Sequence, residues 1–167
     1  MNWKFSIYTL FYQKFEYKNF DHELESLWNG LIDLSPHTIY QLYEINKIWY
    51  NTIGINQKDS ELMISVFFES DNVVAIAPLM TRTKFNLVKE LIFLGEGIFD
   101  YLMIIQKSSN TNNLFEYIFN TLKSKLNVDL ISMSNIPIFL NKVNDNYKYH
   151  LNLYSTNTVL MLDLPDS

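Results

Sequence analysis

Three polar side chains that could do chemistry lie close together in the sequence, around a pair of glycines. Glu96 stands between Gly95 and Gly97, and Asp100 and Tyr101 follow shortly after. Two glycines one residue apart let the backbone turn sharply or take a positive φ. Such a turn between two apolar runs presents its polar side chains at a strand end, where they can face a cleft. Glu96 is therefore a candidate acid or base, and Asp100 and Tyr101 are candidates for binding a polar acceptor such as a sugar or a peptide.

Each of these residues also has a plain structural interpretation. Asp100 could cap the turn while Tyr101 packs in the core, and Glu96 could be a solvated turn residue. Arg82, the only arginine of the chain, could bind an anionic substrate or be a solvated charge at the rim. His37 lies in an expected loop that could line a cleft, so we keep it as a candidate binding residue.

Several other chemistries find no support in the sequence. The chain has no cysteine, and its three histidines show no metal-ligand spacing. Phosphate-bearing cofactors are often bound by the backbone N–H groups of a glycine-rich loop that opens a helix. The only Gly-x-Gly has Glu96 at its centre and leads into a strand-like run. We therefore expect no metal and no cofactor-binding residues in this chain.

Composition limits the class of protein and its partners. The 167 residues are 48% hydrophobic, which fits a single folded domain over residues 1–167. The net charge is −5 and no basic stripe occurs, so we expect no nucleic-acid partner. No apolar run approaches the roughly 20 residues of a spanning helix, and the N-terminus lacks a signal-peptide pattern. These features predict a cytoplasmic protein with no membrane span.

Hydrophobic periodicity predicts the elements that must position the candidate residues. Asp21 is an expected N-cap, Gly54 is an expected C-cap, and Pro78 marks an edge, a bulge or a splay within its strand. We expect Trp28 and Trp49 to be buried, together with the apolar stripe of the 113–126 helix, Leu114, Ile118 and Leu122. We expect four helices: one that begins after Asp21, one over 42–53, one over 113–126 and a short one near Pro137. The expected strands cover 3–16, 62–69, 73–83, 88–94, 102–105, 128–133, 147–153 and 158–164.

This order of elements predicts an α/β fold. Hairpin strands come first and a strand-helix-strand crossover comes later. The sheet is therefore expected to be mixed, with antiparallel hairpins, one parallel crossover and helices on both faces.

The chain resembles a known family of acyltransferases. Residues 93–101, Phe-Leu-Gly-Glu-Gly-Ile-Phe-Asp-Tyr, are similar to the "FLG-x-G-x-x-DY" signature of the GNAT-like acyltransferases related to the cellulose-biosynthesis protein CelD and to the FemAB aminoacyl-transferases. Weaker matches follow the order of that family: Leu24-Glu25 with Leu27-Trp28-Asn29, Ser35-Pro36-His37 with Tyr40-Gln41, Ala75-Ile76-Ala77-Pro78-Leu79, Asp129-Leu130-Ile131 and Leu162-Asp163-Leu164-Pro165.

The resemblance implies a fold, an activity and a partner. Members of the family have two GNAT-like halves in tandem, and this chain is similar to the first half. The implied function is the acceptor-side half of an N-acetyltransferase- or aminoacyltransferase-like enzyme in polysaccharide or cell-envelope biosynthesis. Acyl-CoA would then be bound by a second half, either a homodimer partner or a separately encoded chain. Gln41 joins the expected substrate-binding residues through its matched segment. The alternative is a non-catalytic binding or assembly module, or a truncated, degenerate acyltransferase.

Overall fold

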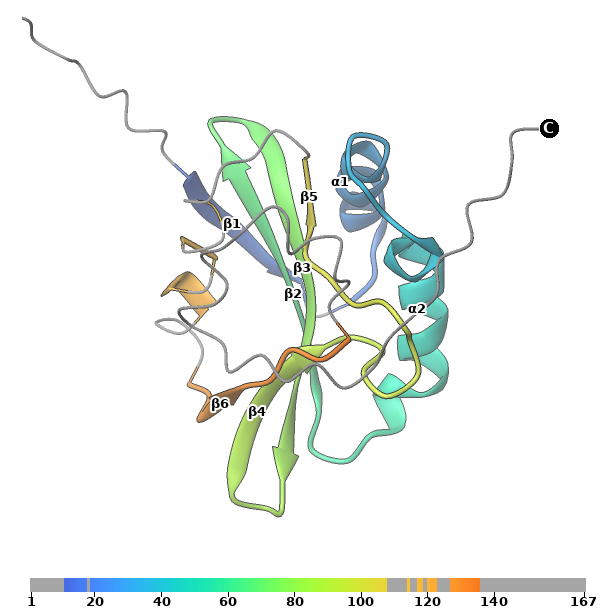
Figure 1. Cartoon of the computed structure of the whole chain (residues 1–167), viewed down its shortest axis with the longest axis vertical. Helices are drawn as coiled ribbons and strands as arrows, with labels where there is room; N and C mark the ends of the chain where they lie inside the picture. Colours follow the sequence, from blue (N-terminus) through green and yellow to red (C-terminus); the bar gives the residue numbers. More distant parts are fainter. Residues whose placement is uncertain are drawn as a thin grey trace, which may run out of the picture.

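The computed structural model describes residues 11–17, 19–107, 114, 117, 118, 120–122 and 127–135, with the backbone alone for 11–16 (Figure 1). The predicted strands at 147–153 and 158–164, the short helix near Pro137 and the closing Leu162-Asp163-Leu164-Pro165 lie outside these residues.

One mixed sheet organises the described residues, as the sequence predicts. Its strands lie in the order β1-β2-β3-β4-β6, and β5 pairs with β3. Every pairing is antiparallel except that of β4 with β6, which is parallel. The strands are β1 (Phe11–Tyr17), β2 (Glu61–Glu69), β3 (Asn72–Lys84), β4 (Val88–Phe93), β5 (Ile105–Gln106) and β6 (Leu130–Ile131).

Helices cover both faces of this sheet. The helices α1 (His22–Ile32) and α2 (Tyr43–Thr52) lie on one side in Figure 1, and the helical residues between 114 and 122 lie on the other. Most positions of β2 and β3 are consequently buried, including successive residues that point to opposite faces. The predicted core residues Leu114, Ile118 and Leu122 are buried in the same cluster as the sheet.

The helix α1 forms as its sequence predicts. The Asp21 side chain accepts a hydrogen bond from the backbone N–H of Leu24 at 2.8 Å and so caps the first turn. Trp28 is fully buried at the centre of the apolar stripe, and its indole N–H donates to the carbonyl of Gln41 at 2.7 Å. This contact fixes the 3-10 turn η1 (Ile39–Gln41) against α1.

The helix α2 buries only part of the apolar stripe that helical spacing predicts, which is Leu42, Ile45, Ile48, Trp49 and Ile53. Leu42 and Ile45 pack against the core, but Ile48 and Ile53 are exposed. Trp49 is buried as predicted, and the polar residue Asn46 is buried beside it. The Asn46 amide donates to the carbonyls of Tyr40 and Leu42, which satisfies its hydrogen bonds inside the fold.

Gly54 has a different role from the predicted C-cap. It begins the second 3-10 turn, η2 (Gly54–Asn56), and Ile53 is the cap residue of α2. A Cβ atom at Gly54 would lie 2.6 Å from the Tyr50 ring and 2.8 Å from the Trp49 ring. Glycine is required here for close packing, because larger residues would collide with these rings.

A ten-residue loop interrupts one edge of β3. Both β4 and β5 pair with β3 on the side opposite to β2, β4 at Leu79–Lys84 and β5 at Ala75–Ile76. The chain leaves this edge after Leu94, whose N–H donates to the Pro78 carbonyl at 2.9 Å, and returns at Ile105. Pro78 has no N–H, so the ladder is broken where the loop departs. Of the three alternatives predicted for Pro78, an edge, a bulge or a splay, this separation of β4 and β5 fits the splay. We call residues 95–104 the excursion loop.

Candidate functional site

The candidate site lies where the two parallel strands of the sheet separate. β4 and β6 pair only over Glu90–Leu91 and Leu130–Ile131, and the chain then leaves both strands at their carboxyl ends. Ligands of open α/β sheets bind beyond the carboxyl ends of parallel strands, where diverging chains leave a crevice. Glu96 follows β4 at this point, and Ser134 follows β6.

The glycine turn after β4 has the backbone conformation that the sequence predicts. Gly95 has φ +87° and Gly97 has φ +84°, which place both in a region that L-residues with side chains rarely adopt. The Phe99 ring fills the space where a Gly95 side chain would lie. Gly95 is therefore needed for its conformation and for the approach of Phe99, whereas Gly97 is needed for its conformation alone.

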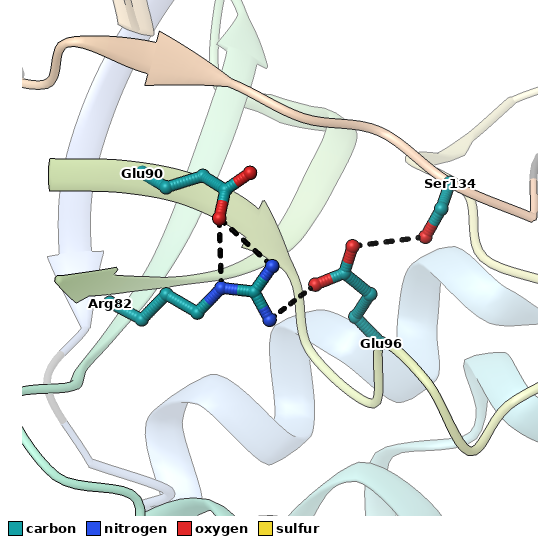
Figure 2. A network of polar contacts seen from close by, with 4 residues as sticks. All are labelled: Arg82, Glu90, Glu96 and Ser134. Atoms are coloured by element: carbon teal, nitrogen blue, oxygen red, sulfur yellow. Dashed lines mark hydrogen bonds and ion pairs between the residues drawn. The ribbon is translucent and has the colours of Figure 1, made fainter. Parts of the chain in front are cut away.

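A network of charged residues holds the glycine turn against β3 (Figure 2). Arg82 Nε and Nη2 both contact Glu90 Oε2, at 2.9 and 2.8 Å. Arg82 Nη1 lies 2.8 Å from Glu96 Oε2, and the Ser134 hydroxyl donates to Glu96 Oε1 at 3.3 Å. One guanidinium thus joins two carboxylates that come from β4 and from the loop beyond it.

The structure corrects the plain interpretations of Arg82 and Glu96. Arg82 is not a solvated rim charge, because it pairs with Glu90, whose side chain is only 2% exposed. Glu96 is not a solvated turn residue either, because its side chain is 15% exposed and bonded. The Glu96 Oε2 atom is buried, and its close partner is the Arg82 guanidinium, with which it forms an ion pair.

The excursion loop also contacts η1, on the face of the sheet that α1 and α2 cover. The Tyr40 hydroxyl donates to Asp100 Oδ2 at 3.1 Å, and the Gln41 amide donates to the Tyr101 carbonyl at 2.8 Å. The Tyr40 ring stacks on Phe99 with a centroid separation of 5.1 Å. The loop is therefore held near its start, by Arg82 at Glu96, and at its middle, by η1 at Asp100 and Tyr101.

The candidate binding residues Gln41, on η1, and His37, just before η1, differ in solvent exposure. Gln41 is buried, and its amide oxygen accepts from the N–H and the hydroxyl of Thr38, completing a capping box. His37 is exposed, and its Nδ1 lies 2.9 Å from the Ser35 carbonyl. Substrate binding by either residue stays a prediction.

Asp100 changes the acid-base properties of its phenol partner. The hydrogen bond to the Asp100 carboxylate raises the pKa of Tyr40 above its usual 10.0, with smaller contributions from desolvation and from the charge of Asp100. Asp100 itself is exposed, and its side chain bonds a tyrosine rather than the backbone of the turn. Tyr101 is half-buried, between the two interpretations that the sequence offered.

Three participants were not singled out by the sequence. Glu90 lies directly opposite Arg82 in the β3–β4 ladder. A prediction of the hairpin register would therefore have identified Glu90 as the partner of Arg82. Tyr40 and Ser134 reach the loop through contacts between residues distant in sequence, for which periodicity gives no signal.

The described residues contain neither a cluster of metal ligands nor a membrane-spanning helix. Within residues 11–107 and the described parts of 114–135, no group of three or more histidine or acidic side chains could hold a metal ion. No helix in that part of the chain is long and apolar enough to cross a bilayer.

Comparison with protein-family models, with curated proteins and with solved structures finds no match for this chain.

Proposed function

We propose that this chain is a GNAT-like acyltransferase domain that binds the acyl acceptor, with the acyl donor bound by a second half or partner. The observation that supports this most is the position of Glu96. An antiparallel meander, β1 to β4, is followed by a crossover to the parallel strand β6, and the glycine turn places Glu96 beyond the carboxyl ends of that pair. The resemblance at residues 93–101 implies this element order and an acyl acceptor at such a turn.

The side chains at this crevice suit a polar acceptor. Glu96 and Glu90 carry two carboxylates against the single guanidinium of Arg82. An amine or hydroxyl could donate to Glu96 Oε1, the oxygen that also accepts from Ser134, while the Arg82 guanidinium keeps the other oxygen in place. Under this proposal Glu96 orients the acceptor, and Arg82 positions Glu96. Asp100 and Tyr101, on the same loop, contact the distal part of an acceptor sugar or peptide.

A donor site within this chain has little support. The glycine turn is occupied by a carboxylate, which repels phosphates, and it leads back into β5 rather than into a helix. The segment 107–113, which precedes the helical residues, contains no glycine. Acyl-CoA would therefore come with a homodimer partner or a separately encoded half, in the cytoplasm, for polysaccharide or cell-envelope biosynthesis.

A non-catalytic binding or assembly module is the second candidate, and one observation favours it. The polar atoms of Gln41 are all bonded within the fold, and Arg82 is held by two carboxylates. Such contacts can serve to fix the excursion loop as a rigid binding surface without any chemistry.

Saturation-transfer NMR with small acceptors tests the proposal. Glucosamine and a lysine-containing tripeptide serve as probes because each carries an amine, on a sugar and on a peptide. We expect saturation transfer from the wild-type protein to at least one probe. Glu96→Gln should abolish it, because the amide lacks the charge that attracts the amine.

Asp71→Asn, an exposed change on the β2–β3 turn, is the matched control and should leave the signal intact. Absence of transfer to both probes, or equal transfer with Glu96→Gln, would favour the non-catalytic module. Bound probes can then be offered with acetyl-CoA and the partner half. Released CoA thiol is measured without protein background because the chain contains no cysteine.

A further inference from the structure

The turn between β3 and β4 carries two large apolar side chains that the fold leaves in water. Phe85 is 82% exposed and Leu87 is 83% exposed, the largest fractions among the described large hydrophobic residues. Figure 1 shows this hairpin extending past the other described strands, at the bottom of the view. We call residues 84–87 the hairpin tip.

The backbone of the hairpin tip makes Phe85 an unfavourable choice for folding. Phe85 and Asn86 both have positive φ, 55° and 56°, and the Leu87 N–H donates to the Lys84 carbonyl at 3.2 Å. Glycine and asparagine are the usual residues at such turn positions, and a bulky side chain there is a true outlier. The Phe85 ring has no core contact to offset this, and only the Lys84 ammonium lies over it, at 5.9 Å. Strain of this kind is typical of functional positions.

Positive charge surrounds the hairpin tip although the whole chain is acidic. Residues 81–89 contain Arg82, Lys84 and Lys89 and no acidic residue, in a chain of net charge −5. Arg82 is already paired with carboxylates, which leaves the two lysines. Two acids lie near this end of the sheet: the Asp129 carboxylate accepts from the Lys89 backbone N–H, and Glu61 lies opposite Thr81 in the β2–β3 ladder.

We propose that the hairpin tip inserts into the surface of a membrane that contains anionic lipids. Phe85 and Leu87 would enter the boundary between headgroups and acyl chains, and Lys84 and Lys89 would contact the anionic headgroups. A convex tip can enter a fluid lipid layer, whereas a protein partner would need a matching pocket. The lysines complement an anionic surface and would be repelled by neighbouring basic proteins. This inference is independent of the acyltransferase proposal.

Sedimentation with sucrose-loaded vesicles tests the proposal on the full chain. We expect partition onto vesicles of phosphatidylcholine with phosphatidylglycerol at millimolar lipid, and much weaker partition onto phosphatidylcholine alone. Phe85→Asn combined with Leu87→Ala should reduce the partition coefficient by at least about tenfold, because most of the inserted apolar surface is lost. Lys84→Gln combined with Lys89→Gln should reduce it by about tenfold and remove its salt dependence.

Ile48→Ala is the matched control, because Ile48 is 57% exposed on α2, away from the hairpin tip, and should leave partition unchanged. The proposal also predicts that Phe85→Asn does not lower the midpoint of urea unfolding, because asparagine adopts positive φ readily. Absence of wild-type partition, or equal partition of the Phe85→Asn/Leu87→Ala variant, would overturn the proposal. So would a clear loss of stability in Phe85→Asn, or self-association through the tip without vesicle binding.

Discussion

Glu90 has its carboxylate almost entirely out of water, and Arg82 supplies both of the contacts to its Oε2 atom. Removing one member of a buried ion pair leaves the other charge desolvated without compensation, which costs more than the pair itself contributes. At the scale of single residues, this pair holds β4 to β3 beside the glycine turn. Glu96 depends on it, because the same guanidinium reaches both carboxylates.

Arg82→Leu should therefore destabilise the protein by about 3 kcal/mol, at the lower end for a buried pair because Arg82 is 32% exposed. Urea unfolding measures this change. Lys84→Leu is the control from the same strand, and as an exposed cation it should cost less than about 0.5 kcal/mol. Equal effects of the two substitutions would mean that the Glu90 contact has no structural importance.

Asp100→Asn should lower the pKa of the Tyr40 phenol toward its usual 10.0. The carboxylate accepts a hydrogen bond from the neutral phenol and opposes the phenolate, so its charge favours the protonated form in the folded state. The resulting stabilisation is present below about pH 10 and is lost as pH rises through the raised pKa. NMR of 13C-labelled tyrosine reports each phenol separately.

Tyr43 is the internal control for this titration. Burial, with smaller contributions from nearby carboxylates, raises the pKa of Tyr43 to about 12, and its hydroxyl donates to the Asp21 carbonyl at 2.8 Å. Asp100→Asn should leave it unchanged. A Tyr40 pKa that does not fall would show that the hydrogen bond to Asp100 is not formed in solution.

At the scale of elements, the excursion loop is the part of the fold on which the candidate site depends. It leaves the β3 edge at Pro78, passes Glu96 and Asp100, and rejoins at Ile105. The ion pair of Glu96 holds its start, and the hydrogen bonds of Asp100 and Tyr101 hold its middle. The Phe99 ring packs between Tyr40 and Trp49. Any change that moves Phe99 should therefore loosen the whole loop.

Gly95→Ala should destabilise the protein by about 2–4 kcal/mol, because a Cβ there meets the Phe99 ring and the φ of +87° is unfavourable for alanine. Gly97→Ala has the same unfavourable φ sign but open space around its Cβ, so it should cost about 1 kcal/mol. Thermal or urea unfolding separates the two variants. A cost for Gly97→Ala as large as that for Gly95→Ala would show that Phe99 does not pack as described.

Elements were predicted well where apolar periodicity coincides with local capping, as in α1 with Asp21 and in the β2–β3 hairpin. The buried face of α2 was predicted only in part: Ile48 and Ile53 are exposed, and the polar Asn46 is buried because its amide donates to the carbonyls of Tyr40 and Leu42. Glu96, Asp100 and Tyr101 lie in one loop, as their closeness in the sequence predicts, and their binding roles stay predictions. Their partners Tyr40 and Ser134 come from tertiary contacts, and no local pattern in the sequence encodes those contacts.

At the scale of the whole molecule, assembly is the main expectation from the resemblance to one half of a tandem enzyme. The predicted strand at 158–164 lies outside the described residues. We still expect a homodimer or a complex with a separately encoded half. Light scattering over a concentration series should show a dimer for the chain alone or a complex with its partner. A monomer at every concentration that also binds no partner half would contradict the expectation of assembly.

We propose that this chain binds the acyl acceptor and that a partner binds the acyl donor. Calorimetric titration of the isolated chain with acetyl-CoA is the sharpest test of this division. We predict no measurable binding, because the only Gly-x-Gly turn of the chain presents Glu96, ion-paired to Arg82, and opens no helix that could receive a pyrophosphate. A micromolar dissociation constant for acetyl-CoA would contradict the claim and would make the chain a complete donor-binding domain.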